Sequence, residues 1–210
     1  MKNSYFVSTN LFLDALLNSS YFKVIQETFD YNNLDPLTGN YQNVAYDCVV
    51  FCEGYQSKSN PWFSYLPVDA TKGETLTVES NDLSCEESYN RKCFSLPLGE
   101  NRFRVGATYV WHTANTELTE EGKTLLLDNL SYLTDQPVTV VDHMAGIRPT
   151  TRDRRPFMGR HPQFNKLAVF NGLGAKGYMM APLLAKELAD HLINGKEIDK
   201  ECRVERILIP

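Results

Sequence analysis

The sequence lacks a long apolar run. Its N-terminal stretch, MKNSYFVSTNLFLDALL, is interrupted by Asn10 and Asp14 and has no small-residue cleavage site, so it is not typical of a signal peptide. No segment approaches the roughly 18 consecutive apolar residues that a membrane-spanning helix requires. These absences predict a soluble, cytoplasmic protein that has no membrane partner.

A surplus of basic charge is also missing. The 210 residues include 21 Lys and Arg and 26 Asp and Glu, so the net charge is −5, and the two signs are interspersed. A nucleic-acid-binding domain would carry a basic patch, so we expect no nucleic-acid partner. A hydrophobic content of 42% is enough for a real core in one large or two small domains.

Spacings typical of a metal site are absent too. A structural zinc site needs two close pairs of Cys or His ligands, whereas Cys85 and Cys93 lie well apart in the sequence and His112 is remote. Alternation along an apolar strand places Cys48 and Cys52 on one face. We therefore expect no metal, and we interpret the cysteines as buried structural thiols: Cys48, Cys52, Cys85, Cys93 and Cys202.

Short helix and strand patterns occupy the first third of the chain. Ser8 or Thr9 favours the start of a helix that ends near residue 20. Apolar and alternating runs predict strands. These strands are expected over residues 23–30, 41–46 and 47–54, followed by a helical turn over 60–67.

The middle of the chain is rich in strand patterns. Residues 71–80 predict a strand, in which Thr75, Thr77 and Glu79 alternate with Leu76 and Val78. Residues 92–111 predict a hairpin that turns at Gly99–Asn101. Thr119 precedes two glutamates, which is typical of a helix start, and this helix is expected to end near residue 134. A further strand is expected over residues 137–148.

The last third predicts a polar loop over residues 150–165, a strand over 166–171 and a long helix over about 176–194. This order of elements favours an α+β fold with a mixed, largely antiparallel sheet flanked by helices. We also expect the strands near residues 49 and 168 to pair in parallel.

Arg148 raises the first functional question, because it ends an apolar run and is followed at once by Pro149. A planar guanidinium binds a carboxylate through two parallel hydrogen bonds, which Lys cannot do. Arg148 is therefore a candidate anion-binding residue. The alternative is that it pairs with Asp153 or Asp142 and braces the loop, and the residues alone leave both open.

Gly172, Gly174 and Gly177 match the G-x-G-x-x-G pattern of dinucleotide-binding folds. Too few residues follow Gly177 to build such a domain, and Pro182 would interrupt a helix that began at Gly174. One alternative is a turn that lets a helix pack closely. Another is a helix N-terminus whose free N–H groups stabilise charge on a bound cofactor.

Several other polar and aromatic residues allow two interpretations. Aromatic side chains near strand and helix ends line a pocket or, more commonly, belong to the core. His143 is a candidate base or a structural histidine. A basic loop holds an anionic substrate or is simply solvated. The aromatic residues are Tyr109, Trp111 and Tyr178, and the basic ones are Arg152, Arg154, Arg155 and Arg160.

Taken together, these segments resemble the C-terminal part of the D-amino-acid oxidase / glycine oxidase family of flavoproteins. Two segments carry most of the resemblance, AGIRPTTRDRRPFMGRHP at 145–162 and VFNGLGAKGYMMAPLLAKELADHLINGK at 169–196. Three shorter ones, DCVVFCEGY, KGETLTV and RFRVGATYV, are similar in order and spacing. The resemblance extends over nearly the whole chain.

The resemblance implies an FAD-dependent enzyme that oxidises the C–N bond of an amino acid or related amine by hydride transfer to flavin. It implies that Arg148 pairs with the carboxylate of the substrate, and it assigns no catalytic residue. Phe29 lies near the position of an adenine contact. The implied flavin contacts are Gly54, Leu173, Gly174, Ala175, Lys176, Gly177, Tyr178 and Met179.

Members of this family begin with a strand, a G-x-G-x-x-G turn and an acidic residue that together hold the ADP half of FAD, and this sequence does not begin in that way. The resemblance therefore implies a C-terminal portion. Residues 1–64 would hold FAD-domain elements, 65–148 the substrate-binding sheet, and 149–210 the C-terminal loop, flavin-contacting turn and helix. An exposed apolar face is expected where the other half packs, and that face favours self-association.

The substrate is less defined. Ala175 occupies a position where glycine oxidases carry a substrate-holding Arg, which argues against glycine itself. D-amino acids, glycine, sarcosine and modified nucleoside side chains are all used in this family. The alternative function is a non-catalytic, stand-alone domain that binds a carboxylate ligand or a protein partner.

Overall fold

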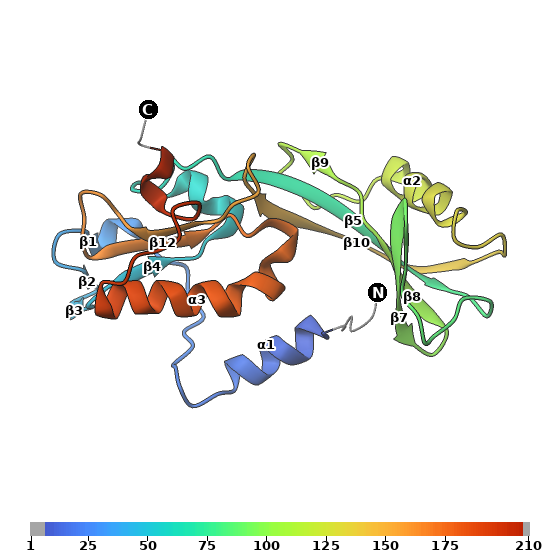
Figure 1. Ribbon diagram of the computed structural model, residues 1–210, viewed down its shortest axis with the longest axis horizontal. Coiled ribbons are helices and arrows are strands. Elements are labelled where there is room, and N and C mark those ends of the chain that lie inside the picture. The colour runs from blue at the N-terminus through green and yellow to red at the C-terminus, as the bar shows by residue number, and fades with distance from the viewer. Residues whose placement is uncertain (1–6, 208–210) are drawn as a thin grey trace.

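The computed structural model describes residues 7–207. Figure 1 shows an elongated molecule in which the long strands β5 and β10 connect a small sheet, covered by α3, to a larger sheet that carries α2. In chain order the helices and strands are α1 (Thr9–Leu17), β1 (Leu34–Asp35), β2 (Asn40–Tyr41), β3 (Val44–Ala45), β4 (Val49–Phe51), β5 (Asp69–Glu79), β6 (Tyr89–Arg91), β7 (Cys93–Gly99), β8 (Arg102–Gly106), β9 (Val110–Trp111), α2 (Glu120–Leu130), β10 (Thr139–Thr150), β11 (Phe157–Arg160), β12 (Leu167–Asn171) and α3 (Gly177–Asn194).

The larger sheet is antiparallel throughout, with the order β10-β5-β8-β7-β6 and with β9 paired to β5. One face packs on α2, where Leu76, Val78 and Phe103 meet Leu126 and Leu130 in one buried cluster. The strand periodicity of two places the alternate residues on the opposite face. The predicted α+β fold with a largely antiparallel sheet is confirmed, as is the hairpin that turns between β7 and β8.

The helix α2 begins where its sequence pattern predicts. The Thr119 side chain accepts a hydrogen bond from the Gly122 amide at 3.0 Å, which satisfies one of the free N–H groups of the first turn. The acidic residues Glu120 and Glu121 complement the positive end of the helix dipole. The helix ends at Leu130, slightly earlier than the sequence suggests.

The smaller sheet has the order β11-β12-β4. The strands β12 and β4 pair in parallel, with Ala168 opposite Val50, as the sequence predicts. The segment 150–165 is not a continuous loop, because it contains β11, whose Phe157 and Met158 are buried on opposite sides of the sheet. A strand this short has too few alternations to stand out in a polar sequence.

The helix α3 begins at Gly177 rather than Gly174 and continues through Pro182, as the helix predicted over about 176–194 implies. A proline removes only one backbone donor, and the packing of Leu184 and Leu188 against Met158 stabilises the rest of the helix. The helix ends at Gly195, whose φ of 67° is the left-handed conformation typical of a C-terminal glycine.

The N-terminal segment differs from its predicted structure. Residues 23–30 form no strand, and residues 41–46 form parts of the two short strands β2 and β3 around a turn. Gln42 and Asn43 both have positive φ there, as a two-residue hairpin turn requires. No residue of α1 is buried, although the Phe12 and Tyr178 rings meet edge to face with their centroids 6.3 Å apart.

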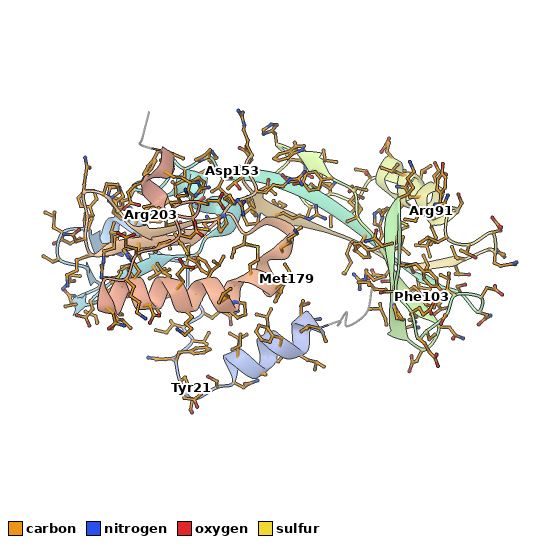
Figure 2. All side chains as sticks on the ribbon, in the orientation of Figure 1. Tyr21, Arg91, Phe103, Asp153, Met179 and Arg203 are labelled. Carbon is orange, nitrogen blue, oxygen red and sulfur yellow. The ribbon has the colours of Figure 1, made fainter. Side chains whose placement is uncertain are left out.

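An apolar surface is exposed along α1 and the first turns of α3, as expected. Figure 2 shows Met179 on α3 and Tyr21 beyond the end of α1, and these side chains are 71% and 93% exposed. The remaining large apolar side chains on these two helices that are exposed are Leu11, Phe12, Leu13, Leu16, Leu17, Tyr178, Leu183 and Ile193.

The cysteines are only partly as expected. Cys93 and Cys202 are buried, whereas Cys52 and Cys85 are exposed, and all five thiols are free. Within residues 7–207, no group of three or more Cys, His, Asp and Glu side chains is arranged to hold a metal ion. None of the helices in that same range is both long enough and apolar enough to span a membrane.

Candidate functional site

Arg148 lies near the end of β10, on the sheet face opposite α2. It pairs with Thr71 in the register of β10 and β5, two positions beyond the Gly146–Gly73 pair. The guanidinium lies directly over Gly73, where a Cβ atom would be 2.1 Å from Nη2. Nη1 donates to the Thr108 carbonyl oxygen at 3.3 Å, and the guanidinium carbon lies 5.4 Å from the centre of the Tyr109 ring.

No carboxylate of the described residues neutralises this guanidinium. Among residues 7–207, no Asp or Glu oxygen lies within 4.0 Å of Arg148, and Asp153 instead pairs with Arg206 at 3.2 Å. The interpretation of Arg148 as a brace paired with Asp153 or Asp142 is therefore wrong. Burial lowers the pKa of the Arg148 guanidinium. A half-buried cation without a counter-charge is energetically costly and is stabilised by an anion.

The glycine-rich turn after β12 lies beside the end of β10. Gly172 and Gly174 have φ values of 78° and 57°, which only glycine adopts without strain. These two conformations turn the chain from β12 into a short 3₁₀ turn, Gly174–Lys176, that leads into α3. A Cβ on Gly174 would lie 4.0 Å from the Pro149 carbonyl oxygen, so the turn passes beside the residue that follows Arg148.

Asn171 joins this turn to Gly54. Its Nδ2 donates to the Gly54 carbonyl oxygen at 2.8 Å, and its Oδ1 accepts from the Gly172 amide at 2.7 Å. A Cβ on Gly54 would lie 3.9 Å from the Pro149 ring. Gly54 and Gly174 therefore both lie against Pro149, and three segments that are distant in the sequence meet at this residue, which follows Arg148 on β10.

A hollow of about 410 Å³ lies at this meeting point. It has the turn on one side and Tyr109 with the end of β10 on the other. The first N–H groups of a helical segment have no acceptor within the helix, so those of the turn are available to a ligand. The hollow is lined by Tyr109, Thr150, Thr151, Arg154, Arg155, Gly172, Leu173, Gly174, Ala175, Lys176 and Met180.

The structure brings together most of the site residues that the sequence singles out. The turn residues from Leu173 to Lys176 line the hollow, and Gly54 lies behind it. Tyr178 and Met179 follow on the exposed first turn of α3. Phe29 does not join them, because its ring stacks on Tyr41 in the core of the smaller sheet, with centroids 4.3 Å apart.

The candidate aromatic residues are exposed, whereas two of the candidate arginines are already paired within the protein. Tyr109, Trp111 and Tyr178 are exposed, so the expectation that these aromatics belong to the core is wrong. Arg160 lies at the end of β11, outside the basic loop, and donates to the Leu192 carbonyl oxygen at 3.0 Å. Arg155 pairs with Glu201 at 3.0 Å.

A buried ionic cluster on the α2 side of the sheet has no counterpart in the sequence-based predictions. Lys72 and Glu74 are almost completely buried on β5, and Lys72 Nζ lies 2.9 Å from Glu74 Oε1. The Thr119 hydroxyl donates to the same oxygen at 2.8 Å. His143 Nε2 lies 2.8 Å from Glu74 Oε2 but is too poorly aligned for a hydrogen bond. His143 therefore faces away from Arg148 and is not placed as a base.

Burial opposes ionisation of the Glu74 carboxyl, but hydrogen bonds from Lys72 and Thr119 outweigh that effect and lower its pKa. The sequence gives one indication of this cluster: Lys72 and Glu74 are spaced by two from each other and from Leu76 and Val78, so all four lie on one face of the strand. That signal reveals a shared face but not the partners.

The chain is similar in sequence and fold to known proteins. Residues 25–191 match the protein family described as FAD dependent oxidoreductase. The chain is 29% identical over 147 residues to the glycine oxidase of Bacillus subtilis (strain 168), an alignment that covers 66% of this chain and 37% of that protein. It is 33% identical over 124 residues to the tRNA 5-methylaminomethyl-2-thiouridine biosynthesis bifunctional protein MnmC of Legionella pneumophila (strain Lens), covering 54% of this chain and 18% of that one.

Among solved structures, the glycine oxidase from Geobacillus kaustophilus superposes with a TM-score of 0.64 at 27% identity. The superposition covers 74% of this chain and 44% of that chain. The chain therefore spans less than half the length of each of these three proteins.

Proposed function

We propose that this chain, which belongs to the FAD dependent oxidoreductase family over residues 25–191, is the substrate-binding portion of an enzyme that oxidises the C–N bond of an amino acid or related amine. The observation that carries the proposal is the guanidinium of Arg148, which has no carboxylate within 4.0 Å among the described residues and lies 5.4 Å from the centre of the ring of Tyr109, a residue that lines the hollow beside the glycine-rich turn. Cofactor, substrate and their relative position would all be determined around this hollow.

Arg148 binds and orients the substrate. Its planar guanidinium pairs with the carboxylate through two parallel hydrogen bonds, while Thr108 and Tyr109 hold the side chain in place. Fixing the carboxylate at one end directs the α-carbon of the substrate toward the hollow. Positioning of this kind lowers the entropic part of the barrier.

The turn is suited to one edge of a flavin ring. Positive φ at Gly172 and Gly174 exposes backbone rather than side chains. The free N–H groups and the dipole of α3 stabilise negative charge that develops nearby. When bound, FAD supplies the acceptor for the hydride that leaves the substrate. We assign ring contacts to Gly54 and to the turn and first helical residues, Leu173, Gly174, Ala175, Lys176, Gly177, Tyr178 and Met179.

Residues 7–207 would contact the ring end of the cofactor, but they contain no nucleotide-binding sheet for its ADP end. The glycine motif at Gly172 follows β12, which belongs to a sheet of three strands, β11-β12-β4. We propose that catalysis requires a nucleotide-binding portion that covers the apolar face of α1 and α3. Ala175 provides no cation at its position in the turn, which favours a substrate other than glycine.

A flavin titration tests this proposal. We expect the chain to quench the fluorescence of FMN and of FAD, with a weak affinity in the high micromolar range. Gly174→Val should weaken that affinity about tenfold or more, because a β-branched residue is strained at a φ of 57°. The matched control is Gly195→Val, which imposes similar strain at φ 67° on the far end of α3. The proposal is contradicted if neither flavin is quenched, or if both variants weaken binding equally.

A further inference from the structure

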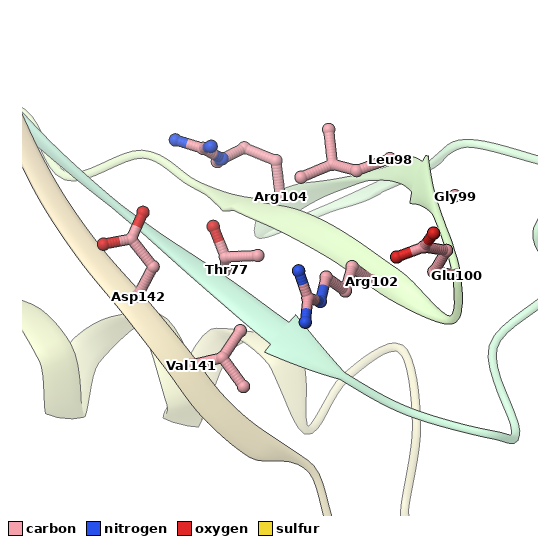
Figure 3. Close-up of a pocket in the computed structure, with 8 residues that line it drawn as sticks. All are labelled: Thr77, Leu98, Gly99, Glu100, Arg102, Arg104, Val141 and Asp142. Atoms are coloured by element: carbon pink, nitrogen blue, oxygen red, sulfur yellow. The ribbon is translucent and has the colours of Figure 1, made fainter.

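A second arginine shares the open sheet face with Arg148. Arg104 on β8 pairs with Thr77 on β5, and Thr77 pairs with Asp142 on β10. Directly paired residues of an antiparallel sheet lie on the same face, so Arg104 and Arg148 both lie on the side opposite α2. Figure 3 shows Asp142, Thr77 and Arg104 in a row across the three strands.

Arg104 is directed along β5 toward Arg148. Its Nη1 lies 3.4 Å from the Thr75 hydroxyl and 3.7 Å from the Met144 sulfur. Thr75 is two positions from Gly73, over which Arg148 lies. Residues two apart on a strand are separated by about 7 Å, so two guanidiniums occupy adjacent sites on one face.

Arg104 also lacks a counter-charge among the described residues. Within the described part of the chain, no carboxylate oxygen lies within 4.0 Å of it, and its buried Nε has no hydrogen-bond partner. Arg102, on the same strand and face, differs in this respect because its Nε binds Glu79 Oε1 at 3.0 Å. An arginine that makes only a hydroxyl and a thioether contact retains most of its donors for a ligand.

We propose that Arg104 forms a second carboxylate subsite, so that the preferred substrates are amino acids or N-substituted amino acids that carry a second carboxylate. Arg148 binds the first carboxylate and Arg104 the second, with Thr75 and Met144 between them. This inference rests on the proposed function for the role of Arg148, and it adds the class of substrate.

Asp142 limits the strength of this subsite. Its carboxylate lies on the same face one strand beyond Thr77 and lines the same hollow as Arg104. Like charges on neighbouring groups raise the free energy of a bound carboxylate. Removal of the Asp142 charge is therefore expected to strengthen binding of the second carboxylate, whereas removal of the Arg104 charge weakens it.

The test compares succinate with propionate, which has one carboxylate fewer, by calorimetric titration of the whole chain. We expect succinate to bind about tenfold more tightly, a difference of about 1.4 kcal/mol, with Arg104→Gln abolishing that preference and leaving propionate unchanged. Asp142→Asn should increase the preference. The matched control, Arg102→Gln, removes a paired arginine from the same strand and should leave both affinities unchanged.

Four results would overturn the proposal: no preference for succinate in the unaltered protein, an undiminished preference in Arg104→Gln, an equal loss in Arg102→Gln, or a weaker preference in Asp142→Asn. Propionate reports on Arg148 alone. If an Arg148 variant binds propionate as tightly as the unaltered protein, the proposed function is contradicted. If propionate binding depends on Arg148 but the unaltered protein does not prefer succinate, only the second subsite is contradicted. Melting temperatures of all variants identify any that fail to fold.

Discussion

Replacement of Glu74 by Ala is expected to lower the free energy of unfolding by about 3–5 kcal/mol. The Lys72 side chain is only 4% exposed, and Glu74 provides its only carboxylate partner within the described residues. Truncation of Glu74 would leave a buried ammonium without counter-charge and would remove the acceptor for the Thr119 hydroxyl at the start of α2. The loss is measured by urea unfolding at neutral pH.

Two controls separate the buried charge from the loss of volume. The double variant Lys72→Met/Glu74→Leu removes both charges and should recover most of the lost stability, because well-packed apolar pairs often replace a buried ion pair at little cost. Glu79→Ala breaks the exposed pair with Arg102 and should change stability by less than about 1 kcal/mol. Equal destabilisation by Glu74→Ala and Glu79→Ala would refute this account of the cluster.

The Glu74 carboxylate should also affect how stability depends on pH. The pKa of Glu74 is lower in the folded protein than its ordinary value, so its contribution is complete above the ordinary carboxyl range and is lost as the pH falls through the lowered value. Stability of the unaltered protein should therefore decrease more steeply in acid than that of the double variant. Parallel acid profiles would show that Glu74 is not stabilised as a carboxylate.

Gly73→Ala is expected to weaken carboxylate binding about tenfold to a hundredfold while changing stability little. The new Cβ would lie 2.1 Å from Arg148 Nη2, so the guanidinium must leave its position over the strand. The displaced group is the end of a flexible side chain and moves at low cost, but its alignment with a bound carboxylate is lost. Calorimetric titration with propionate measures the effect.

Gly146 provides a matched control, because it is paired directly with Gly73 on β10 and a Cβ there would meet nothing within 4 Å. Gly146→Ala should leave propionate affinity unchanged and should not destabilise the strand, where glycine is unfavourable. A similar loss of affinity in both variants would mean that Arg148 is not held over Gly73.

The sequence was sufficient for those elements whose pattern is local. The strand over 71–80, the turn at Gly99–Asn101 and the Thr119 helix start each depend on neighbouring residues and are observed. Residues 23–30 show why a strand-like pattern alone is not enough: Val24 and Ile25 remain exposed, and no strand within residues 7–207 pairs with this segment. A strand is stable only with a partner.

The site was predictable where a motif was present and hidden where it depended on register. Arg148 and the glycine-rich turn are identified through their resemblance to a known family. Only the structure shows that no carboxylate of the described residues lies within 4.0 Å of Arg148. The contact of Glu74 with Thr119 joins residues 45 positions apart, and the proximity of His143 follows from the pairing of β10 with β5. Neither relation is present in the local sequence.

The central claim is that Arg148 is held open for a carboxylate, and propionate binding to the unaltered chain and to Arg148→Lys tests it most directly. Lysine keeps the positive charge but not the planar pair of donors. The account predicts measurable propionate binding that Arg148→Lys weakens about tenfold or more, with an unchanged melting temperature. Equal affinities in the two proteins would contradict it, because the carboxylate would then be bound elsewhere or by charge alone.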